Sequence, residues 1–414
     1  MQSERIVVSY AGVHQAYQLA LAAQEMGELQ AFYCALYDAP KCWGARFANF
    51  VGKGYFEGRR ADGLELDKVV EFPWPLIWKV MRDQFYRRGR ENWLTVNSAF
   101  DLYVARQLQR SSPSIFVGTA TSDLHSLKAL KRNGATLVHD CVAVHPFLHT
   151  RLLEMAAERV GMKIRKRKSP GRMEERKLRE YDLADILLVY SGFHRKSFED
   201  AGFAPERIFE SPLWVDQSFW YRDATDYPGC SRPDKPLKLL FVGSISLMKG
   251  VPFLLDAVAQ CGASVVLTIV GTPPLSAHPS LLPKSRNVSY LLPQSKMQLR
   301  TTYQMHDVLV LPSVCDSFGF VALEAMACGL PVIMTENCGA PAPDSSWRVP
   351  AMDSRRLAER ILYYADERTR ISEDGKTALA FSAIYTPERY RNNVRKLFTT
   401  ILKKASGLSL KHPL

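Results

Sequence analysis

The sequence predicts an α/β protein with two Rossmann-like domains, each a doubly wound parallel sheet, that face each other across a cleft. Short apolar runs alternate with amphipathic segments along most of the chain, which is the order of elements that builds parallel sheets. Near the middle, a stretch rich in proline and glycine has no hydrophobic periodicity and is typical of a linker. With 414 residues, the chain is long enough for two domains that each have a hydrophobic core.

The C-terminal half shows the alternation most clearly. Its apolar runs are typical of strands buried on both faces of a parallel sheet, and they occupy residues 238–242, 264–271, 287–293, 307–313 and 331–336. Helical patterns lie between these runs at residues 251–262 and 295–306. Because doubly wound sheets bind ligands at the carboxyl ends of their strands, we expect functional loops after Val242, Val270 and Leu311.

The N-terminal half shows the same alternation less clearly. We expect strands within residues 5–12, 29–37, 114–120, 136–141 and 185–192, and helices within residues 14–27 and 123–134. Residues 40–110 fit no simple pattern and are rich in aromatic and basic side chains. We interpret them as insertions and helices around one rim of the first domain.

These patterns divide the chain into four parts. We expect an N-terminal Rossmann-like domain at residues 1–212, a linker at residues 213–236 and a C-terminal Rossmann-like domain at residues 237–385. Residues 386–414 form the C-terminal helix and tail. This helix begins with Thr386 and Pro387, a helix start signal, and we expect it to pack back on the N-terminal domain.

Composition and charge indicate a globular protein with anionic partners. The formal net charge is +12, which favours phosphorylated substrates, acidic lipid headgroups or nucleic acid. The eight cysteines have no spacing typical of a zinc site, and no two aspartates stand at the Asp-x-Asp spacing that often holds a metal, so we expect no metal. The N-terminus lacks the apolar core of a signal peptide, and no stretch is apolar enough to span a bilayer, which predicts a cytoplasmic protein.

Residues 307–336 carry the most specific pattern in the chain. They predict a buried strand, a polar loop with Asp316 and Gly319, a short helix with Glu324 near its start, and a second strand. Oriented carboxylates accept from vicinal hydroxyls while helix N-terminal amides face anions, so this pattern suits a ligand with hydroxyls and phosphates. Structural readings remain open, because Asp316 also suits a turn and Glu324 also favours a helix N-terminus through the helix dipole.

Three segments, in the right order, resemble glycosyltransferase family 4 (group 1), which contains nucleotide-sugar-dependent enzymes of the GT-B fold. They are VGSISLMKG with Lys249 and Gly250, PSVCDSFGFVALEAMACGLPVI with its two carboxylates, and the connector ADILLVYSGFHRKSFEDAGFAPERIFESPLWVD ending at Asp216. Together they span about half of the chain. Earlier in the chain the match is looser, at Gly12 and at TLVHDC with His139.

The resemblance implies a donor-binding set in the C-terminal domain and an acceptor-binding N-terminal domain. Glu324 matches the carboxylate that accepts from the ribose, Asp316 matches the one that contacts the donor sugar, and Lys249 matches the lysine that neutralises the diphosphate. His139 matches the histidine on the acceptor side of the reacting carbon, although a core histidine and a competing role of His145 stay open. The remaining donor-binding positions that it implies are Gly12, Gly243, Ser244, Ser317, Phe318, Gly319 and Phe320.

Two positions depart from the family pattern. The first carboxylate is usually glutamate, and Asp316 is one methylene shorter. The usual Arg-x4-Lys pair is reduced to Ser244 and Lys249, so one diphosphate cation is missing at its expected position. Arg195 and Arg286 are the candidates that we weigh as substitutes. These departures put the donor sugar, or activity itself, in question.

The expected function is transfer of a sugar, with retention, from a nucleoside-diphosphate sugar to a saccharide or lipid-linked acceptor, without a cofactor. Two alternatives remain: a nucleotide-sugar epimerase or hydrolase, and a non-catalytic sugar-nucleotide-binding protein at a membrane. Residues 159–179 contain ten lysines and arginines against two glutamates, and residues 74–90 are aromatic and basic. Such segments suit peripheral contact with an anionic membrane surface or are solvated faces. No nucleic-acid-binding module is recognised.

Overall fold

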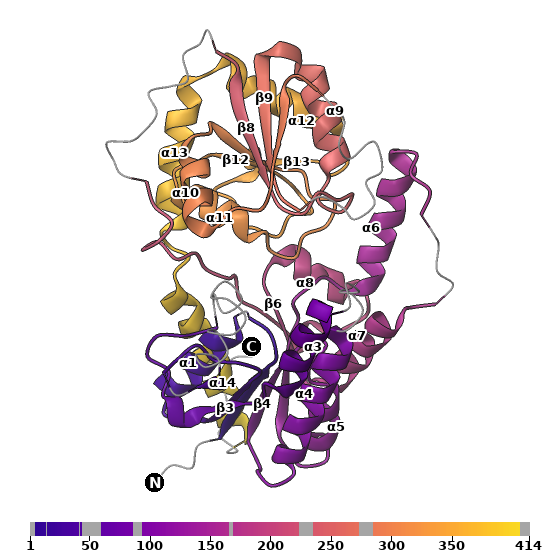
Figure 1. Cartoon of the computed structure of the whole chain (residues 1–414), viewed down its shortest axis with the longest axis vertical. Coiled ribbons are helices and arrows are strands. Elements are labelled where there is room, and N and C mark those ends of the chain that lie inside the picture. The colour runs from indigo at the N-terminus through magenta and orange to yellow at the C-terminus, as the bar shows by residue number, and fades with distance from the viewer. Residues whose placement is uncertain are drawn as a thin grey trace.

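The computed structural model describes residues 5–13, 15–40, 42–43, 59–85, 93–164, 169–222, 235–272 and 285–405. Two α/β domains lie one above the other along the long axis of the molecule (Figure 1). The predicted fold class, two doubly wound parallel-sheet domains, is confirmed.

The N-terminal domain contains a seven-stranded parallel sheet in the order β3-β2-β1-β4-β5-β6-β7. Its chain order reverses between β1 and β4, which places a topological switch point between these strands. The strands are β1 (Ile6–Tyr10), β2 (Leu29–Cys34), β3 (Val69–Glu71), β4 (Ile115–Thr119), β5 (Thr136–Asp140), β6 (Ile186–Val189) and β7 (Ile208–Glu210).

The C-terminal domain contains a six-stranded parallel sheet in the order β10-β9-β8-β11-β12-β13. Its switch point lies between β8 and β11. The strands are β8 (Leu237–Val242), β9 (Val265–Val270), β10 (Val288–Leu291), β11 (Val308–Leu311), β12 (Val332–Thr335) and β13 (Arg348–Val349).

Helices cover both faces of each sheet. The helices of the N-terminal domain are α1 (Ala16–Glu25), α3 (Trp74–Phe85), α4 (Trp93–Leu108), α5 (Leu124–Leu130), α6 (Pro146–Arg159), α7 (Arg172–Leu183) and α8 (Gly192–Glu199). Of these, α6 reaches the C-terminal domain, where its Leu152 and Ala156 pack with Phe253. The C-terminal half adds α9 (Val251–Cys261), α10 (Lys296–Gln304), α11 (Phe320–Ala327), α12 (Ser354–Asp366), α13 (Thr369–Ser382) and α14 (Pro387–Ala405).

Burial explains why the central strands were readable from sequence. Every residue of β4, β6, β11 and β12 is buried, because helices pack on both sides of these strands. In β1, Ile6 and Val8 face the side covered by α1 and α14, whereas Val7 faces the side covered by α4 and α5. The edge strand β10 alternates between half-buried and exposed residues and covers less core.

The irregular region at residues 40–110 contains more order than the sequence indicated. It supplies the edge strand β3 and the helices α3 and α4, while residues 44–58 and 86–92 lie outside the described part. The strands β7 and β13 were also not predicted. They have three and two residues, so their apolar runs are too short to be distinguished from loop.

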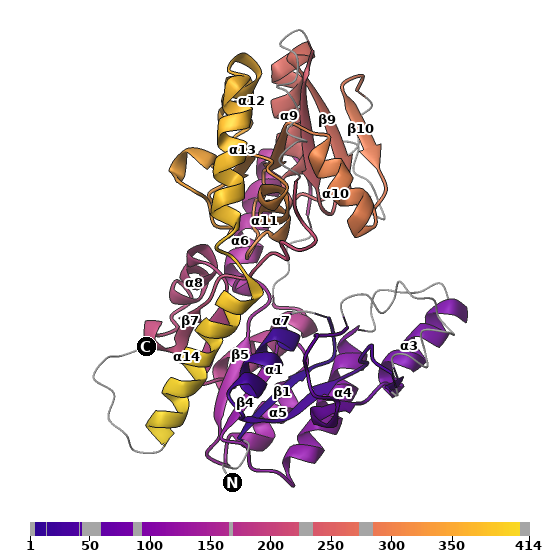
Figure 2. The ribbon, with the colours of Figure 1, turned by 90° about the vertical axis from the view of Figure 1, so that its left-hand side faces the viewer.

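The C-terminal helix packs back on the N-terminal domain, as the sequence predicted. Figure 2 shows α14 running along that domain beside α1. Leu397 and Phe398 of α14 join the same core as Leu19 of α1. At the edge of this contact, Glu25 forms an ion pair with Arg391 at 2.7 Å and accepts a hydrogen bond from Arg395 at 2.9 Å.

Two segments therefore connect the domains. The first is the linker, of which residues 213–222 are described, and the second is the turn between α13 and α14. The backbone N–H of Val215 donates to the carbonyl of Tyr385 at 3.0 Å, so the two connecting segments are hydrogen-bonded to each other.

We expect Phe398→Ala to lower the free energy of unfolding of the N-terminal domain by about 3–5 kcal/mol, because it removes a fully buried ring from the α14 contact. Urea unfolding followed by circular dichroism measures the change. Lys404→Ala, in the same helix but exposed, is the control and should change stability by less than about 0.5 kcal/mol. Equal unfolding midpoints for the two variants would contradict a core closed by α14.

Candidate functional site

The loops that follow β8 and β11 meet at the switch point of the C-terminal sheet. β8 pairs directly with β11, so their carboxyl ends are neighbours at one edge of the sheet. The backbone N–H groups of Val314 and Cys315 donate to the carbonyl of Met248 at 2.9 and 3.3 Å, which joins the two loops. This edge is where a doubly wound sheet holds its ligand.

Two glycines make this approach possible. Gly250 has a φ of 73°, and a Cβ atom there would lie 1.7 Å from the carbonyl oxygen of Pro312. Gly319 has a φ of 75°, and a Cβ atom there would lie 2.8 Å from the sulfur of Cys338. Both residues are helix N-caps, Gly250 for α9 and Gly319 for α11. Any side chain at either position would push the loops apart.

Lys249 and Asp316 form an ion pair between the two loops. The Nζ atom of Lys249 lies 2.5 Å from Oδ2 of Asp316, and both side chains keep some accessible surface. Burial alone would lower the pKa of the Lys249 ammonium, but the charge and hydrogen bond of Asp316 outweigh it, and the pKa is raised. Lys249 is therefore a fixed cation at the switch point.

The loop between β11 and α11 presents backbone donors beside this pair. The N–H groups of Ser317, Phe318 and Gly319 have no hydrogen-bond partner within the described residues, and α11 begins immediately after them. The Asp316 backbone is held by the loop after β12, because its N–H donates to Asn337 at 3.0 Å and its carbonyl accepts from Gly339 at 2.9 Å. Amides fixed in this way suit an anion.

Ser317 also connects this loop with the N-terminal domain. Its carbonyl accepts from the hydroxyl of Ser191 at 2.8 Å, and its own hydroxyl donates to the carbonyl of Val142 at 3.2 Å. Ser191 follows β6 and Val142 follows β5, so these contacts join the carboxyl ends of both sheets. The site is thus bounded by both domains.

Glu324 lies in α11 as its fifth residue and is half-buried. Its Oε2 accepts from the hydroxyl of Tyr303 in α10 at 3.0 Å. Burial raises the pKa of the Glu324 carboxyl to about 7, while the Tyr303 hydrogen bond and the charge of Lys296 act in the opposite direction. The remaining oxygen of Glu324 has no hydrogen-bond partner among the described residues and is suited to accept from a ligand hydroxyl.

Ser244 does not replace the missing arginine, and neither do the two candidates weighed from sequence. Ser244 is exposed and lies 3.5 Å from the hydroxyl of Ser246. All three guanidinium nitrogens of Arg195 bond to Glu199 or to backbone carbonyls within the N-terminal domain. Arg286 precedes β10 and therefore lies at the amino end of that strand, at the opposite edge from the ligand loops.

Gly243 directly follows β8, and Gly12 is the second residue after β1. Gly243 approaches Gly271 so closely that a Cβ on the latter would lie 1.7 Å from the Gly243 carbonyl oxygen. At Gly12, a Cβ would meet the ring of Tyr10 at 2.6 Å. Both glycines thus have packing reasons, and their predicted contact with a ligand stays a prediction.

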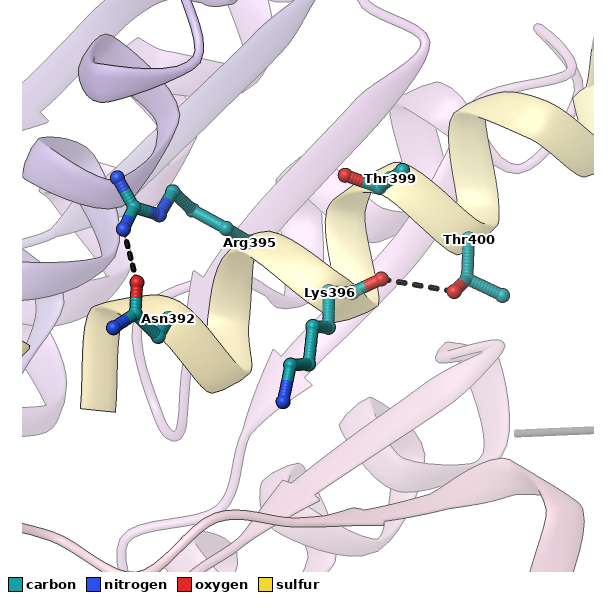
Figure 3. A pocket seen from close by; sticks show the side chains of 5 residues that line it. All are labelled: Asn392, Arg395, Lys396, Thr399 and Thr400. Atoms are coloured by element: carbon teal, nitrogen blue, oxygen red, sulfur yellow. Dashed lines mark hydrogen bonds between the residues drawn. The ribbon is translucent and has the colours of Figure 1, made fainter. Parts of the chain in front are cut away.

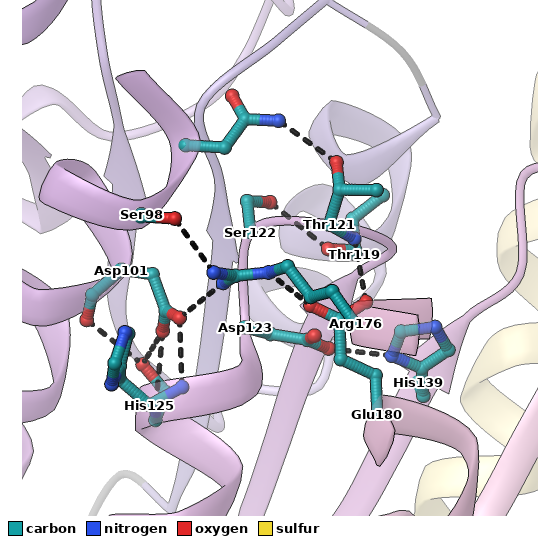
Figure 4. Close-up of polar contacts among 12 residues, drawn as sticks. Ser98, Asp101, Thr119, Thr121, Ser122, Asp123, His125, His139, Arg176 and Glu180 are labelled. Atoms are coloured by element: carbon teal, nitrogen blue, oxygen red, sulfur yellow. Dashed lines mark hydrogen bonds and ion pairs between the residues drawn. The ribbon is translucent and has the colours of Figure 1, made fainter. Parts of the chain in front are cut away.

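His139 lies inside the N-terminal domain. Its side chain has no accessible surface, and Nδ1 lies 2.6 Å from Oδ2 of Asp123 (Figure 4). A side chain without accessible surface cannot touch a substrate unless it rearranges. The catalytic role of His139 stays a prediction that requires the Asp123 pair to open.

A buried ionic network surrounds this pair. Arg176 donates to Glu180 at 2.8 Å, to Asp101 at 2.6 Å and to the hydroxyl of Ser98 at 2.7 Å (Figure 4). The second oxygen of Glu180 accepts from the backbone N–H of Thr121 at 2.7 Å. At least one side chain of the basic run at residues 159–179, that of Arg176, is therefore buried in the domain and not available to a membrane surface.

Asp123, His139 and Glu180 are residue types that also bind metals, and their ligand atoms lie within 4.8 Å of one another. However, one Asp123 oxygen already pairs with His139, and both Glu180 oxygens already accept from Arg176 and Thr121. Burial raises the pKa of Asp123 and lowers that of His139, which favours a neutral pair. The cluster fits a proton-sharing structural network better than a cation site.

His145 has a structural role. It is the N-cap of α6, its ring accepts from the N–H of Phe147 at 3.3 Å, and its side chain is buried among aromatic rings. Burial lowers the pKa of His145 to about 4, so the ring is neutral at physiological pH.

A surface hollow elsewhere on the molecule holds none of the predicted site residues. It lies along α14, and Figure 3 shows that its lining comes from this one helix: Asn392, Arg395, Lys396, Thr399 and Thr400. Arg395 donates to Asn392, and Thr400 donates to the Lys396 carbonyl at 2.8 Å.

Residues 236–367 match the family of glycosyl transferases group 1. The matched region is less than half of the chain. The D-inositol 3-phosphate glycosyltransferase of Mycolicibacterium smegmatis is 40% identical over 110 residues, 24% of this chain and 25% of that protein. The putative colanic acid biosynthesis glycosyltransferase WcaL of Salmonella typhimurium is 26% identical over 207 residues, 46% of this chain and 49% of that protein. The chain spans between about a quarter and a half of the length of these relatives.

Solved structures share the fold over the whole chain. Anabaena Alr3699/HepE in complex with UDP has a TM-score of 0.61 at 14% identity, covering 97% of this chain and 100% of that one. WaaG, a glycosyltransferase involved in lipopolysaccharide biosynthesis, has a TM-score of 0.61 at 16% identity, covering 95% and 99%. At such identities the likeness shows the fold, two facing α/β domains of the GT-B type.

We expect Arg176→Ala to destabilise the N-terminal domain by about 3–5 kcal/mol, because it leaves Asp101 and Glu180 buried without their cation. Thermal and urea unfolding measure the loss. Arg179→Ala, one turn along α7 and exposed, removes the same charge and should have little effect. If the two variants were equally stable, the network would not contribute to the fold.

Proposed function

We propose, from the premise that residues 236–367 form a group 1 glycosyl transferase domain, that this protein transfers a sugar from a nucleoside diphosphate to an acceptor hydroxyl. One observation supports the proposal most strongly. A fixed cation, a carboxylate, free backbone donors and a second carboxylate all lie on loops and a helix at the switch point of that domain: Lys249, Asp316, Ser317 to Gly319, and Glu324.

Each of these groups suits one part of the donor. Glu324 has an oxygen available for the ribose hydroxyls, and its other oxygen is fixed by Tyr303. Lys249 and the amides that precede α11 suit the diphosphate. Asp316 suits the sugar hydroxyls, but in the absence of donor it pairs with Lys249. Donor binding would therefore divide this pair, because the diphosphate competes for the ammonium group.

In the reaction, the bond between the anomeric carbon and the diphosphate oxygen breaks, and a bond to the acceptor oxygen forms. The acceptor hydroxyl loses its proton, and the leaving diphosphate gains negative charge that Lys249 and the α11 amides stabilise. We propose retention of the anomeric configuration from the resemblance to family 4. We propose a metal-independent mechanism, since Lys249 and the amides that precede α11 supply positive charge for the leaving group.

The acceptor belongs to the side formed by the N-terminal domain. Ser191 and Val142 contact the donor loop through Ser317, so the carboxyl ends of β5 and β6 border the site. We propose a saccharide or lipid-linked acceptor, as in the synthesis of cell-surface polysaccharide or glycolipid. An epimerase or hydrolase acting on the same donor, and a protein that binds donor without turnover, are the alternatives that activity assays separate.

An exposed aromatic face on the N-terminal domain favours an acceptor at a membrane. The four tryptophans that precede residue 100 are all exposed, Trp43, Trp74, Trp78 and Trp93, and Trp78 keeps 62% of its surface. Figure 2 shows α3, which carries two of them, projecting from the domain. Indole rings favour the boundary between lipid and water, and the chain carries a net charge of +12. No helix in the described part could span a bilayer.

We expect Glu324→Gln to weaken UDP binding by about 10- to 100-fold, since a hydrogen bond to a charged group contributes about 1.5–3 kcal/mol. UDP is the nucleotide bound in a solved GT-B neighbour, so it is tested first. Isothermal titration calorimetry measures the affinity. Glu336→Gln, an exposed glutamate after the next strand, is the control. If Glu324→Gln bound UDP as tightly as wild type, the proposed contact between Glu324 and the ribose would be wrong.

The pH dependence of UDP binding tests the same carboxyl. With its pKa raised to about 7, Glu324 is protonated as pH falls below 7, and the carboxylate acceptor is lost. Wild-type affinity should therefore decrease between pH 8 and pH 6. Tyr303→Phe removes a hydrogen bond that lowers this pKa, so its midpoint should move to higher pH. A pH-independent affinity in both chains would contradict this assignment.

We expect wild type to sediment with anionic liposomes at low salt, and the double variant Trp74→Ser with Trp78→Ser to bind them about tenfold or more weakly. Burial of one large apolar side chain contributes about 1.5–3 kcal/mol, which is enough for this loss. Met297→Ser, which changes an exposed apolar residue of the C-terminal domain, should bind like wild type. Equal binding by all three chains would rule out this face as the contact.

A further inference from the structure

Arg59 is a buried cation without a counter-ion. The residue is only 4% exposed. Its Nη1 reaches the carbonyl oxygen of Ala11 at 3.5 Å, at the outer limit of a hydrogen bond, and its Nε has no partner. Among the described residues, Arg59 forms no ion pair with a carboxylate, whereas its neighbour Arg60 pairs with Asp62 at 2.9 Å.

Such an arrangement is costly in a folded protein. A guanidinium group cannot lose its charge at ordinary pH, so burial removes its hydration without the neutralisation that a lysine or histidine allows. Buried arginines are therefore normally paired or fully hydrogen-bonded. Arg59 is neither, and this pattern is typical of a group whose partner is a ligand.

Arg59 lies beside the loop that follows β1, where the N-terminal sheet has its own switch point. Ala11, which it contacts, is the first residue after that strand, and the loop leads into α1. The loop is thus at the carboxyl edge of the sheet, on the side where Ser191 and Val142 meet the other domain.

The N-terminus of α1 faces the same loop and lacks a cap. Its N-cap residue, Gln15, makes no side-chain hydrogen bond to the helix, and the first turn contains no acidic residue. Gln15 instead directs its amide nitrogen to Tyr190 and Asp140, and its carbonyl oxygen has no partner. The N–H of Gln18 donates to the Gln15 carbonyl at 2.8 Å, so within the described residues only the N–H groups of Ala16 and Tyr17 are available to an anion.

The nearby carboxylates bond to groups other than Arg59, although Oδ2 of Asp140 has no hydrogen-bond partner among the described residues. Asp140 accepts from the hydroxyl of Tyr190 at 2.6 Å, and Glu71 accepts from the backbone N–H groups of Tyr37 and Trp43, each at 2.8 Å. The surrounding Tyr10, Tyr17 and Cys34 carry no charge, because burial raises the pKa of each. Among the described residues, no carboxylate forms an ion pair with Arg59.

We propose that Arg59, together with the N-terminus of α1, binds a phosphate oxyanion of a ligand at the N-terminal edge of the site. Two sources have this chemistry. The first is the donor diphosphate, for which Arg59 would supply from the opposite domain the second cation that Ser244 does not. The second is a phosphate group on the acceptor. The first source rests on the proposed function, whereas the second requires only an anion site in the N-terminal domain.

The test compares Arg59→Met with wild type and with Arg60→Gln, which changes the adjacent, exposed and paired arginine. Thermal unfolding without ligand comes first. A side chain held for a ligand destabilises the empty protein, so Arg59→Met should have a higher Tm than wild type. A lower Tm for Arg59→Met would show a structural role and overturn the proposal.

Binding is then measured with two probes, inorganic phosphate and UDP. If the donor is the source, Arg59→Met should lose about 10- to 100-fold in UDP affinity, the effect of one charged hydrogen bond. If the acceptor is the source, UDP affinity should be unchanged while binding of inorganic phosphate is lost. Arg59→Lys, which keeps the charge without the planar fork, should retain part of the affinity.

Equal affinity of Arg59→Met and wild type for both probes overturns the proposal. Failure of the proposed function is recognised separately, because wild type would then bind no UDP, while a loss of inorganic phosphate binding in Arg59→Met relative to wild type would still report on Arg59. Glu324→Gln serves as the control for the donor site, since it should weaken the binding of UDP and leave the binding of inorganic phosphate unchanged.

Discussion

The close approach of two strand ends in the C-terminal domain is the constraint on which the candidate site depends. β8 and β11 are adjacent in the sheet although β9 and β10 separate them in the chain, so their loops must share one small volume. Gly250 meets the Pro312 carbonyl at a distance that excludes any side chain, and the Lys249 ammonium thereby reaches Asp316 at 2.5 Å. The positions of the α11 amides and of Glu324 follow from that contact, because α11 begins at the end of the same loop.

The sequence could predict what depends on composition over several residues. Central strands such as β4 and β11 were readable because both faces are buried, and Lys249, Asp316 and Glu324 were readable because they stand at strand ends and helix starts. Tyr303 and Ser191 carried no signal, since each acts on a partner that is distant in the chain. For His139, the predicted position near the end of a strand is confirmed. Its burial in a pair with Asp123 could not be predicted, because that pair depends on packing between β5 and the loop after β4.

The two domains use charge in different ways. The C-terminal domain leaves its ion pair partly accessible, with 34% of the Lys249 side chain and 14% of the Asp316 side chain exposed. The N-terminal domain buries its charges in a network in which Arg176 joins Asp101 and Glu180 and fixes the loop after β4 through Thr121. Thr121 has a φ of 71°, an unusual backbone conformation for this residue type that the Glu180 hydrogen bond helps to hold. The first arrangement leaves its charges partly accessible, whereas the second gives rigidity to the opposite wall.

The return of α14 to the N-terminal domain has a consequence for the order in which the protein is completed during synthesis. The ribosome makes the first sheet and α1 early, but the face of α1 that Phe398 covers stays open until the last helix emerges. The first domain to be made is therefore the last to be finished, and the C-terminal domain must fold while its neighbour still exposes an apolar surface. Chains that stop before residue 387 would carry a complete C-terminal sheet beside an N-terminal domain that cannot close.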